Sequence, residues 1–196
     1  MAKLYYQGHS SYRITANDGN VIYVDPSMGD GYDFPADIIL VTHQHHDHNR
    51  IELPAKKNNT RIITNIEALA GGQHNSFTEF GIKIESVEAK NLIHNPKKCV
   101  GYIITVDGIQ IYAAGDTSIT KQMASFAERH FDYALLPCDG IVNMSLKEAA
   151  RCATLIGAKH NIPIHLKPGK LFDRARAEKW TAPNRLIVEH GEEITL

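Results

Sequence analysis

The sequence predicts a mixed α/β fold in which helices cover β-sheets. Short apolar runs typical of strands dominate the first two-thirds of the chain, helical patterns are few, and strands alternate with those helices near the end. Of the 196 residues, 43% are hydrophobic and 22% are charged, which is ordinary for a chain that buries a core. We therefore expect one domain that spans residues 1–196.

Seven apolar runs in the first two-thirds of the chain indicate strands. They cover residues 11–14, 21–24, 38–42, 61–64, 82–87, 100–106 and 109–113. The turn sequences Asn-Asp-Gly-Asn at residues 17–20 and Asp-Gly at residues 107–108 separate neighbouring runs. Both turns predict β-hairpins.

Three segments have helical features. Apolar residues recur at helical spacing over residues 118–129. A second helix is expected to begin at Ser145, because Glu148 three residues later completes a capping-box pattern, and to end at Gly157. A third, short and charged helix is expected over residues 173–180. Further short strands are expected at residues 133–136, 162–164 and 186–188.

The composition disfavours several classes of function. Lys plus Arg total 21 and Asp plus Glu total 22, so the net charge of −1 offers no overall positive field, and a nucleic-acid partner is not expected. Apolar runs such as residues 38–41 are far shorter than the ~20 residues of a membrane helix, and residues 1–7 lack the apolar stretch of a signal peptide. The three cysteines form no CxxC pair. We expect a cytoplasmic protein with reduced thiols and no membrane partner.

Histidine is the one unusual part of the composition, with 11 in the chain and four of them within residues 43–48. His43 and His45 are two residues apart after a predicted strand, so an extended backbone points both imidazoles to one side. A turn then brings Asp47 and His48 to face the same space. Imidazole nitrogens and carboxylate oxygens are ligands of zinc and similar divalent ions, so we favour a metal site over a His-rich surface turn.

Two more residues of ligand type follow predicted strands. Asp116 follows the run at residues 109–114, and Gly115 before it allows the backbone to turn sharply. His165 follows the short run at residues 162–164. Either residue alone would more often be a helix cap or a structural histidine, but together they strengthen the prediction of a metal site.

These residues resemble the ordered motifs of the metallo-β-lactamase superfamily. The motifs are Gly8-His9-Ser10-Ser11, Ile22 to Pro26, His43-x-His45-x-Asp47-His48, Gly115-Asp116-Thr117 and Ile164-His165. The chain is most similar to the small branch that includes L-ascorbate-6-phosphate lactonases and N-acyl phosphatidylethanolamine phospholipase D. The resemblance implies a four-layer αββα sandwich with a dinuclear metal site along one edge of its sheets.

The resemblance also implies a set of metal ligands. His43 and His45 would hold the first ion, Asp47, His48 and His165 would hold the second, and Asp116 would bridge both. The superfamily usually supplies a third histidine to the first ion. Asn91 stands where that histidine is often found, and we assign the role to His94, three residues later.

The function that the resemblance implies is metal-dependent hydrolysis. Two divalent ions, zinc or else manganese, would share a hydroxide that attacks a lactone or phosphodiester of a small molecule. Asp47 or Asp116 would steer the hydroxide, and His9 or solvent would protonate the leaving group. Asp25 would orient a ligand imidazole. The loop with Lys167, Lys170 and Arg174 is expected to be a solvated run of charges; the alternative is an anion-binding rim that would suit a phosphate or carboxylate on the substrate.

Two alternatives lie outside hydrolysis. A di-iron oxidoreductase of this fold usually carries Glu at the second ligand position, where this chain has His45. A non-catalytic metal-binding protein would not need seven polar ligands. A β-lactamase is disfavoured, because Asp116 stands where the zinc-dependent β-lactamases usually place Cys. The oligomeric state is left open.

Overall fold

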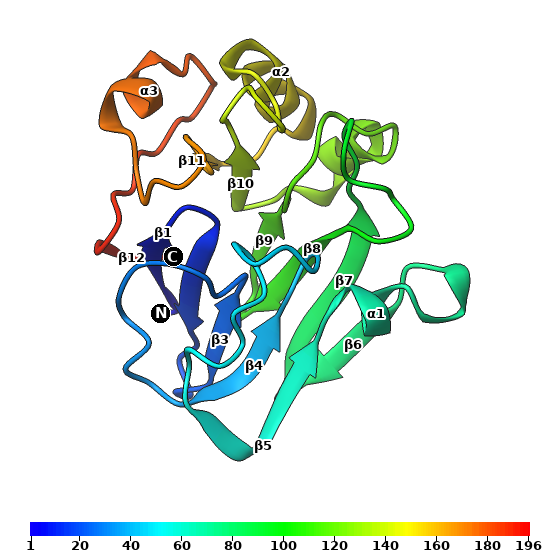
Figure 1. Ribbon diagram of the computed structural model, residues 1–196, viewed down its shortest axis with the longest axis vertical. Coiled ribbons are helices and arrows are strands. Elements are labelled where there is room, and N and C mark those ends of the chain that lie inside the picture. The colour runs from blue at the N-terminus through cyan, green and yellow to red at the C-terminus, as the bar shows by residue number, and fades with distance from the viewer.

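Two six-stranded sheets pack face to face in the computed structural model, which describes residues 1–196 (Figure 1). The first sheet has the strand order β12 (Glu193–Thr195), β1 (Lys3–Gly8), β2 (Ser11–Thr15), β3 (Val21–Val24), β4 (Ala36–Leu40) and β5 (Lys56–Ile63). The second has the order β11 (His160–Ile164), β10 (Tyr133–Pro137), β9 (Ile109–Ala113), β8 (Val100–Val106), β7 (Ile82–Glu88) and β6 (Ser76–Glu79). The prediction of a mixed α/β sandwich is confirmed.

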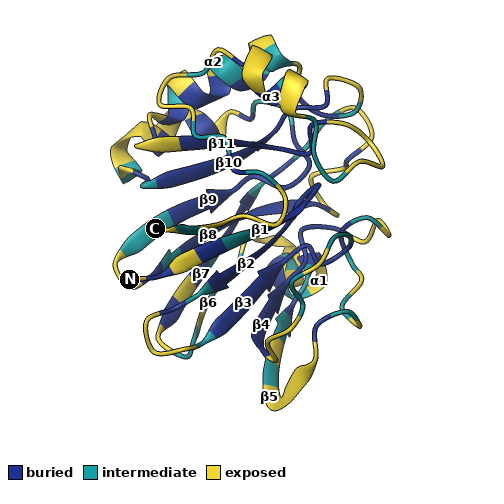
Figure 2. Ribbon diagram, turned by 90° about the vertical axis from the view of Figure 1, so that its left-hand side faces the viewer, coloured by how far each residue is buried: buried dark blue, intermediate teal, exposed yellow.

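Five short helices complete the chain. They are α1 (Asn65–Ala68), the 3₁₀ helices η1 (Ala70–Gly72) and η2 (Gln122–Arg129), α2 (Leu146–Ile156) and α3 (Arg174–Lys179). Figure 2 shows α2 and α3 above the outer face of the second sheet. None of the helices has the length and apolar character needed to cross a bilayer.

Each sheet combines antiparallel and parallel pairs. Strands β1, β2 and β3 are antiparallel, and β4 and β5 then run parallel to β3. In the second sheet β6 to β9 are antiparallel, whereas β9, β10 and β11 are parallel. Since parallel strands end at the same edge of a sheet, the loops that follow them gather there. Both predicted hairpins, β2–β3 and β8–β9, are present.

The main core lies between the two sheets. It contains 25 buried apolar residues from strands of both, including the fully buried rings of Tyr6, Tyr12 and Tyr102. The hydroxyl of Tyr102, on β8, donates to the backbone oxygen of Val41, which follows β4 in the other sheet. A second apolar cluster packs η2, α2 and α3 against the second sheet and includes Trp180. The outer face of the first sheet is covered by loops rather than by a long helix.

Two predicted elements differ in the structure. Residues 118–129 do not form one helix, because the backbone N–H groups of Ser118 and Ile119 bond to Lys90 and Glu148 outside the segment, and a 3₁₀ helix begins only at Gln122. Residues 186–188 form no strand: near them only Arg185 makes an isolated bridge. The α2 boundaries follow the prediction, with Ser145 as N-cap and Gly157 as a left-handed C-cap, although the side chain of Glu148 accepts from Ile119 instead of closing the capping box.

Candidate metal centre

The predicted ligands lie at the carboxyl ends of strands, at one edge of the sandwich. His43 follows β4, Asp116 follows β9 and His165 follows β11. Backbone bonds join the two sheets at this edge: the N–H of Val100 donates to Thr42, and the N–H of His165 donates to His9. Segments that are far apart in the sequence therefore meet at a single site.

Several residues here have unusual backbone conformations. His9, Asp25 and His165 have φ values of 58°, 47° and 45°, in the left-handed region that residues with a side chain seldom adopt. Gly115 has φ of 62°, and a Cβ on it would come within 3.0 Å of the side chain of Thr42. Such conformations cluster at functional sites, where the surrounding structure enforces them. Gly115 is therefore required to bring Asp116 close to the loop at residues 42–48.

All seven predicted ligands converge on this edge. Ligand-type side-chain atoms form three overlapping groups here, each within 4.8 Å, and two of these groups add His9 or Cys99 to the predicted ligands. The groups are His9 with Asp47, His48 and His165; His43 with His48 and Asp116; and His43 with His94 and Cys99. His45, whose side chain is largely exposed, completes the set, because its Nδ1 lies 3.2 Å from Nε2 of His94. Nitrogen ligands of a tetrahedral zinc ion lie roughly 3.3 Å apart, so this pair has the spacing of two ligands of one ion.

Four of the histidines are held from behind through Nδ1. The Nδ1 atom of His48 lies 2.8 Å from Oδ2 of Asp25, and Nδ1 of His165 lies 3.0 Å from Oδ2 of Asp139. Behind the other two, Asn91 Oδ1 lies 2.8 Å from Nδ1 of His94, and Thr42 Oγ1 lies 3.1 Å from Nδ1 of His43. An outer partner on one ring nitrogen is typical of metal-bound histidine, because it leaves the other nitrogen free to bind the ion.

Buried polar atoms without partners test whether a metal fits. Nε2 of His43, Nε2 of His48 and Oδ1 of Asp116 are buried and make no hydrogen bond. Leaving such atoms unpaired costs about 1–3 kcal/mol each, so buried polar groups nearly always have a partner. Nitrogen and carboxylate donors aimed at a shared space fit divalent ions of the zinc type.

The charges of the site are strongly coupled. Burial lowers the pKa of His43 to about 2, and the neighbouring His48 acts in the same direction. Burial also opposes protonation of His48, but the carboxylates of Asp116 and Asp25 outweigh it and raise its pKa to about 9. Burial raises the pKa of Asp116, yet the surrounding histidines lower it overall, so this carboxylate is ionised at neutral pH.

Metal affinity should therefore rise with pH. A metal ligand must be deprotonated, and His48 keeps its proton up to a pKa of about 9 in the metal-free protein. Between pH 6.5 and 8.5 the ion that binds His48 displaces this proton, and the apparent affinity of that position for zinc should increase up to about tenfold per pH unit. Chelator competition across this range measures the slope, and proton release in weak buffer counts the proton. An affinity that is independent of pH would contradict this account of His48.

His9 lies directly behind Asp47. Its ring is fully buried, with Nδ1 3.3 Å from the backbone oxygen of Lys170 and Nε2 3.3 Å from Oδ2 of Asp47. The ring also packs on that of His165, with 3.8 Å between centroids. The hydrogen bond between Nε2 of His9 and Asp47 is the main cause of the lowered pKa of Asp47. The side chain of Asp47 is 32% exposed. Asp47 is thus an ionised carboxylate that is open to solvent and backed by a buried histidine.

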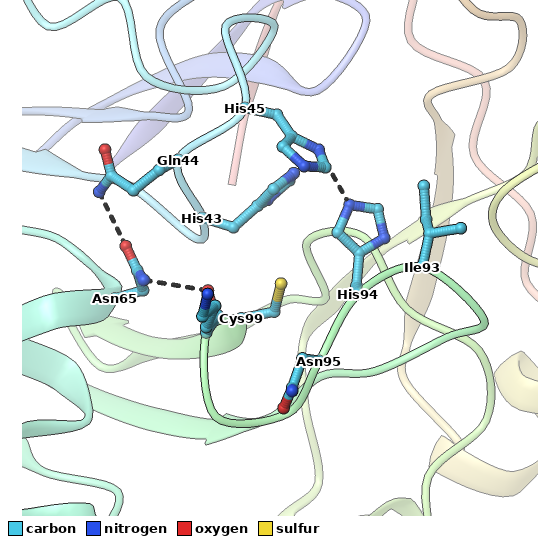
Figure 3. A pocket seen from close by; sticks show the side chains of 9 residues that line it. His43, Gln44, His45, Asn65, Ile93, His94, Asn95 and Cys99 are labelled. Atoms are coloured by element: carbon cyan, nitrogen blue, oxygen red, sulfur yellow. Dashed lines mark hydrogen bonds between the residues drawn. The ribbon is translucent and has the colours of Figure 1, made fainter.

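A pocket of about 480 Å³ opens beside the histidines (Figure 3). It is lined by His43, Gln44, His45, Asn65, Ile93, His94, Asn95, Lys98 and Cys99. Asn65 holds two walls together, because it accepts from the side chain of Gln44 and donates to the backbone oxygen of Lys98. The lining contains no carboxylate, and the ammonium of Lys98 makes no ion pair.

None of the three cations in the loop at residues 167–174 lines the pocket beside the histidines, so the loop does not form the alternative anion-binding rim there. The charge of Arg174 is taken up by ion pairs with Glu178 and Glu189. Lys170 contributes its backbone oxygen to the ring of His9. Lys167 lines a separate pocket of about 440 Å³. Lys98, for which the sequence carries no motif, is the one lysine or arginine among the residues that line the pocket beside the histidines.

Other contributors to the site were not assigned from the sequence. Asp139 and Asn143 lie in the loop after β10, where Asp139 contacts His165 and accepts from Asn143. Cys99 groups with His43 and His94 within 4.8 Å. A polar residue directly after a buried strand, as at Asp139, was the available signal. Asn143 had none, because its role depends on contacts with residues distant in the sequence.

Comparisons with known proteins agree with this geometry. A family model described as the β-lactamase superfamily domain matches residues 3–165. A metal-dependent hydrolase of Thermococcus kodakarensis is 31% identical, and the match covers 100% of both chains. The crystal structure of a metal-dependent hydrolase from Parabacteroides distasonis is 30% identical, with a TM-score of 0.76 over 96% of this chain and 93% of that chain.

A more distant solved structure has the same fold. It is described as a zinc-dependent hydrolase of the metallo-β-lactamase superfamily from Thermotoga maritima, is 22% identical, and has a TM-score of 0.69 over 96% of this chain and 99% of that chain. The family model covers most of the residues that form the two sheets, and its matched range ends at His165, the last of the predicted ligands. The chain therefore belongs to the metallo-β-lactamase superfamily, among its metal-dependent hydrolases.

Proposed function

We propose that the protein uses two zinc ions to hydrolyse an ester-type bond of a small anionic molecule, either a lactone or a phosphodiester. The observation that carries the proposal is a set of three buried atoms of metal-ligand type that make no hydrogen bond, namely Nε2 of His43, Nε2 of His48 and Oδ1 of Asp116. His43, His45 and His94 would hold one ion, Asp47, His48 and His165 the other, and Asp116 both. When bound, such ions activate water as a nucleophile and polarise a carbonyl or phosphoryl oxygen.

The choice of zinc follows from the donor set. Five imidazoles and two carboxylates suit zinc better than magnesium or calcium, which prefer oxygen ligands. The relative from Thermotoga maritima is described as zinc-dependent. A di-iron oxidoreductase is less well supported, because His45 stands at the second ligand position, where di-iron enzymes of this fold usually carry Glu.

The experiment that tests this function is turnover by protein loaded with zinc. The substrates are bis(p-nitrophenyl) phosphate, an anionic phosphodiester, and a small aliphatic lactone, each measured before and after removal of the metal with a chelator. We expect turnover of at least one that is lost with the metal and returns with zinc. Equal rates with metal-free and zinc-loaded protein would contradict the proposal.

Asp47 and His9 would together move the proton. Hydrolysis takes a proton from water and gives one to the leaving oxygen. The exposed carboxylate of Asp47 is placed to accept the proton from water, and Nε2 of His9 lies 3.3 Å from Oδ2 of this carboxylate. We expect His9→Ala to lower kcat by about 10²–10⁴, the usual contribution of general acid–base catalysis, and to alter the pH profile of kcat.

The control for His9 is His46→Ala, which removes an exposed histidine that makes no hydrogen bond or ion pair with the site residues. This variant should keep the wild-type kcat. If His9→Ala also left kcat and its pH profile unchanged, the role assigned to His9 would be wrong.

Lys98 supports the anionic substrate. It is the only charged residue among those that line the pocket, apart from the histidines. An exposed charge pair contributes about 0.2–1 kcal/mol, so Lys98→Gln should raise KM for bis(p-nitrophenyl) phosphate by about 2–5-fold. The matched control is Lys97→Gln, since Lys97 is the adjacent exposed lysine and does not line the pocket. Equal effects of the two substitutions, or an equal effect of Lys98→Gln on the neutral ester p-nitrophenyl acetate, would contradict a specific contact.

A further inference from the structure

We propose that Asn143 is a positioning residue that couples the two halves of the metal centre, through a chain of polar contacts between His94 and His165. The inference rests on the proposed dinuclear site, in which these two histidines belong to different ions. Asn143 is itself 7% exposed and is not a metal ligand.

The chain of bonds crosses from one loop to another. Nδ1 of His94 lies 2.8 Å from Oδ1 of Asn91. Nδ2 of Asn91 donates to Oδ1 of Asn143 over 2.8 Å, and Nδ2 of Asn143 donates to Oδ2 of Asp139 over 2.8 Å. The same carboxylate oxygen lies 3.0 Å from Nδ1 of His165. The bond between Asn91 and Asn143 joins residues 52 positions apart in the sequence.

Both ends of this chain fix the direction of donation. Oδ1 of Asp139 accepts the backbone N–H groups of residues 141–143, so its carboxylate acts only as an acceptor. Oδ1 of Asn91 accepts the backbone N–H groups of residues 93–94. An amide that accepts on one side donates on the other, so each asparagine has a single orientation. The histidines at the two ends therefore both carry their proton on Nδ1 and keep the Nε2 lone pair for an ion.

In this arrangement Asn143 bonds both to its own loop, through Asp139, and to the loop that carries His94, through Asn91. The loop after β7 carries Asn91 and His94, whereas the loop after β10 carries Asp139 and Asn143. Asn91 holds His94 and Asp139 holds His165, and the hydrogen bond from Asn91 to Asn143 joins these two loops behind the ligands, on the side opposite the shared carboxylate of Asp116. An ion that binds on the His165 side therefore also orders His94, and the two ions should bind cooperatively.

The substitution that tests this is Asn143→Leu, which keeps the branching and the number of side-chain heavy atoms and removes both hydrogen bonds. We expect zinc affinity, measured by chelator competition, to fall 10–100-fold, as is usual for the partner of a metal ligand, and the cooperativity between the two ions to be lost. The matched control is Asn161→Ala. Asn161 is a fully buried asparagine whose amide donates to the backbone oxygen of Pro183, away from the site. This control should lower the unfolding temperature without changing zinc affinity.

A spectroscopic readout separates coupling from simple loss of structure. Protein loaded with ¹¹³Cd should give two NMR signals, which His94→Gln and His165→Gln assign to the two positions. Asn91→Ala, at the half-buried end of the chain, should then shift the signal of the His165 position as well as that of the nearer one. This variant also replaces Asn143→Leu as the test if the leucine variant fails to fold.

Wild-type protein is measured first, because its stoichiometry tests the dinuclear site by itself. Fewer than two ions per wild-type chain would overturn the proposed site and this inference with it. Two ions in the wild type, with unchanged zinc affinity and cooperativity in Asn143→Leu, would overturn the coupling alone. A ¹¹³Cd signal for the His165 position that does not respond to Asn91→Ala would do the same.

Discussion

Asp116→Ala should abolish hydrolysis and reduce the bound metal from two ions to at most one. Asp116 is the one carboxylate that faces ligands of both ions: its oxygens lie 3.5 Å from Nε2 of His48, 3.7 Å from Nε2 of His94 and 3.7 Å from Nε2 of His165. Bound ions contribute several kcal/mol of transition-state stabilisation, so we expect kcat/KM to fall by roughly 10³-fold or more.

The control for Asp116 is Asp37→Ala. Asp37 is also a buried carboxylate, but it bonds to Lys57 and to the backbone of Val21, away from the site. This control should lower stability and leave the metal content unchanged. Circular dichroism checks that Asp116→Ala is folded, and elemental analysis counts the ions in both variants. Wild-type metal content and turnover in folded Asp116→Ala would contradict the role of a shared ligand.

Asp25→Ala should weaken both metal binding and the fold around the site. Oδ1 of Asp25 accepts the backbone N–H of Thr42, and Oδ2 accepts the hydroxyl of Thr42 and lies 2.8 Å from Nδ1 of His48. Removal of the carboxylate leaves these buried donors unpaired, which costs about 1–3 kcal/mol each. It also frees the ring of His48, and loss of such a partner lowers metal affinity about 10–100-fold.

Two measurements separate the effects of Asp25. Denaturant unfolding of the metal-free protein gives the loss of stability, and chelator competition gives the loss of zinc affinity. Thr42→Val is a matched comparison, because it removes the hydroxyl bond but leaves the bond between Asp25 and His48. Asp25→Ala should therefore lower zinc affinity more than Thr42→Val does, and equal effects would contradict the orienting role of Asp25.

The sequence predicted the central strands and the residues that follow them. Strands β3, β8 and β9 have the bounds expected from their apolar runs, since these strands are buried on both faces. Strands β1, β6 and β12 were not predicted. Strands β6 and β12 are edge strands, and β6 in particular is short, polar and half exposed, so its pattern resembles that of a loop.

The histidines divide clearly between site and surface. Six of the 11 lie at the metal centre, namely His9, His43, His45, His48, His94 and His165. The other five, at residues 46, 74, 130, 160 and 190, are exposed. His43, His45 and His48 share one loop after a buried strand and His165 directly follows another, whereas His9 and His94 were assigned from the resemblance to the superfamily motifs.

The supporting contacts were less predictable than the ligands. Asp25 could be expected because it follows β3. Asn91, Asn143 and Lys98 lie within loops, and their roles depend on how loops from different parts of the chain pack together. No local pattern encodes such a contact, so it becomes visible only in the folded structure.

Elemental analysis of the protein after reconstitution with zinc and removal of excess metal tests the central claim most directly. The geometry predicts two zinc ions per chain, because two sets of histidine and carboxylate donors share Asp116. One ion per chain, or none, would contradict the dinuclear centre on which the proposed hydrolysis depends.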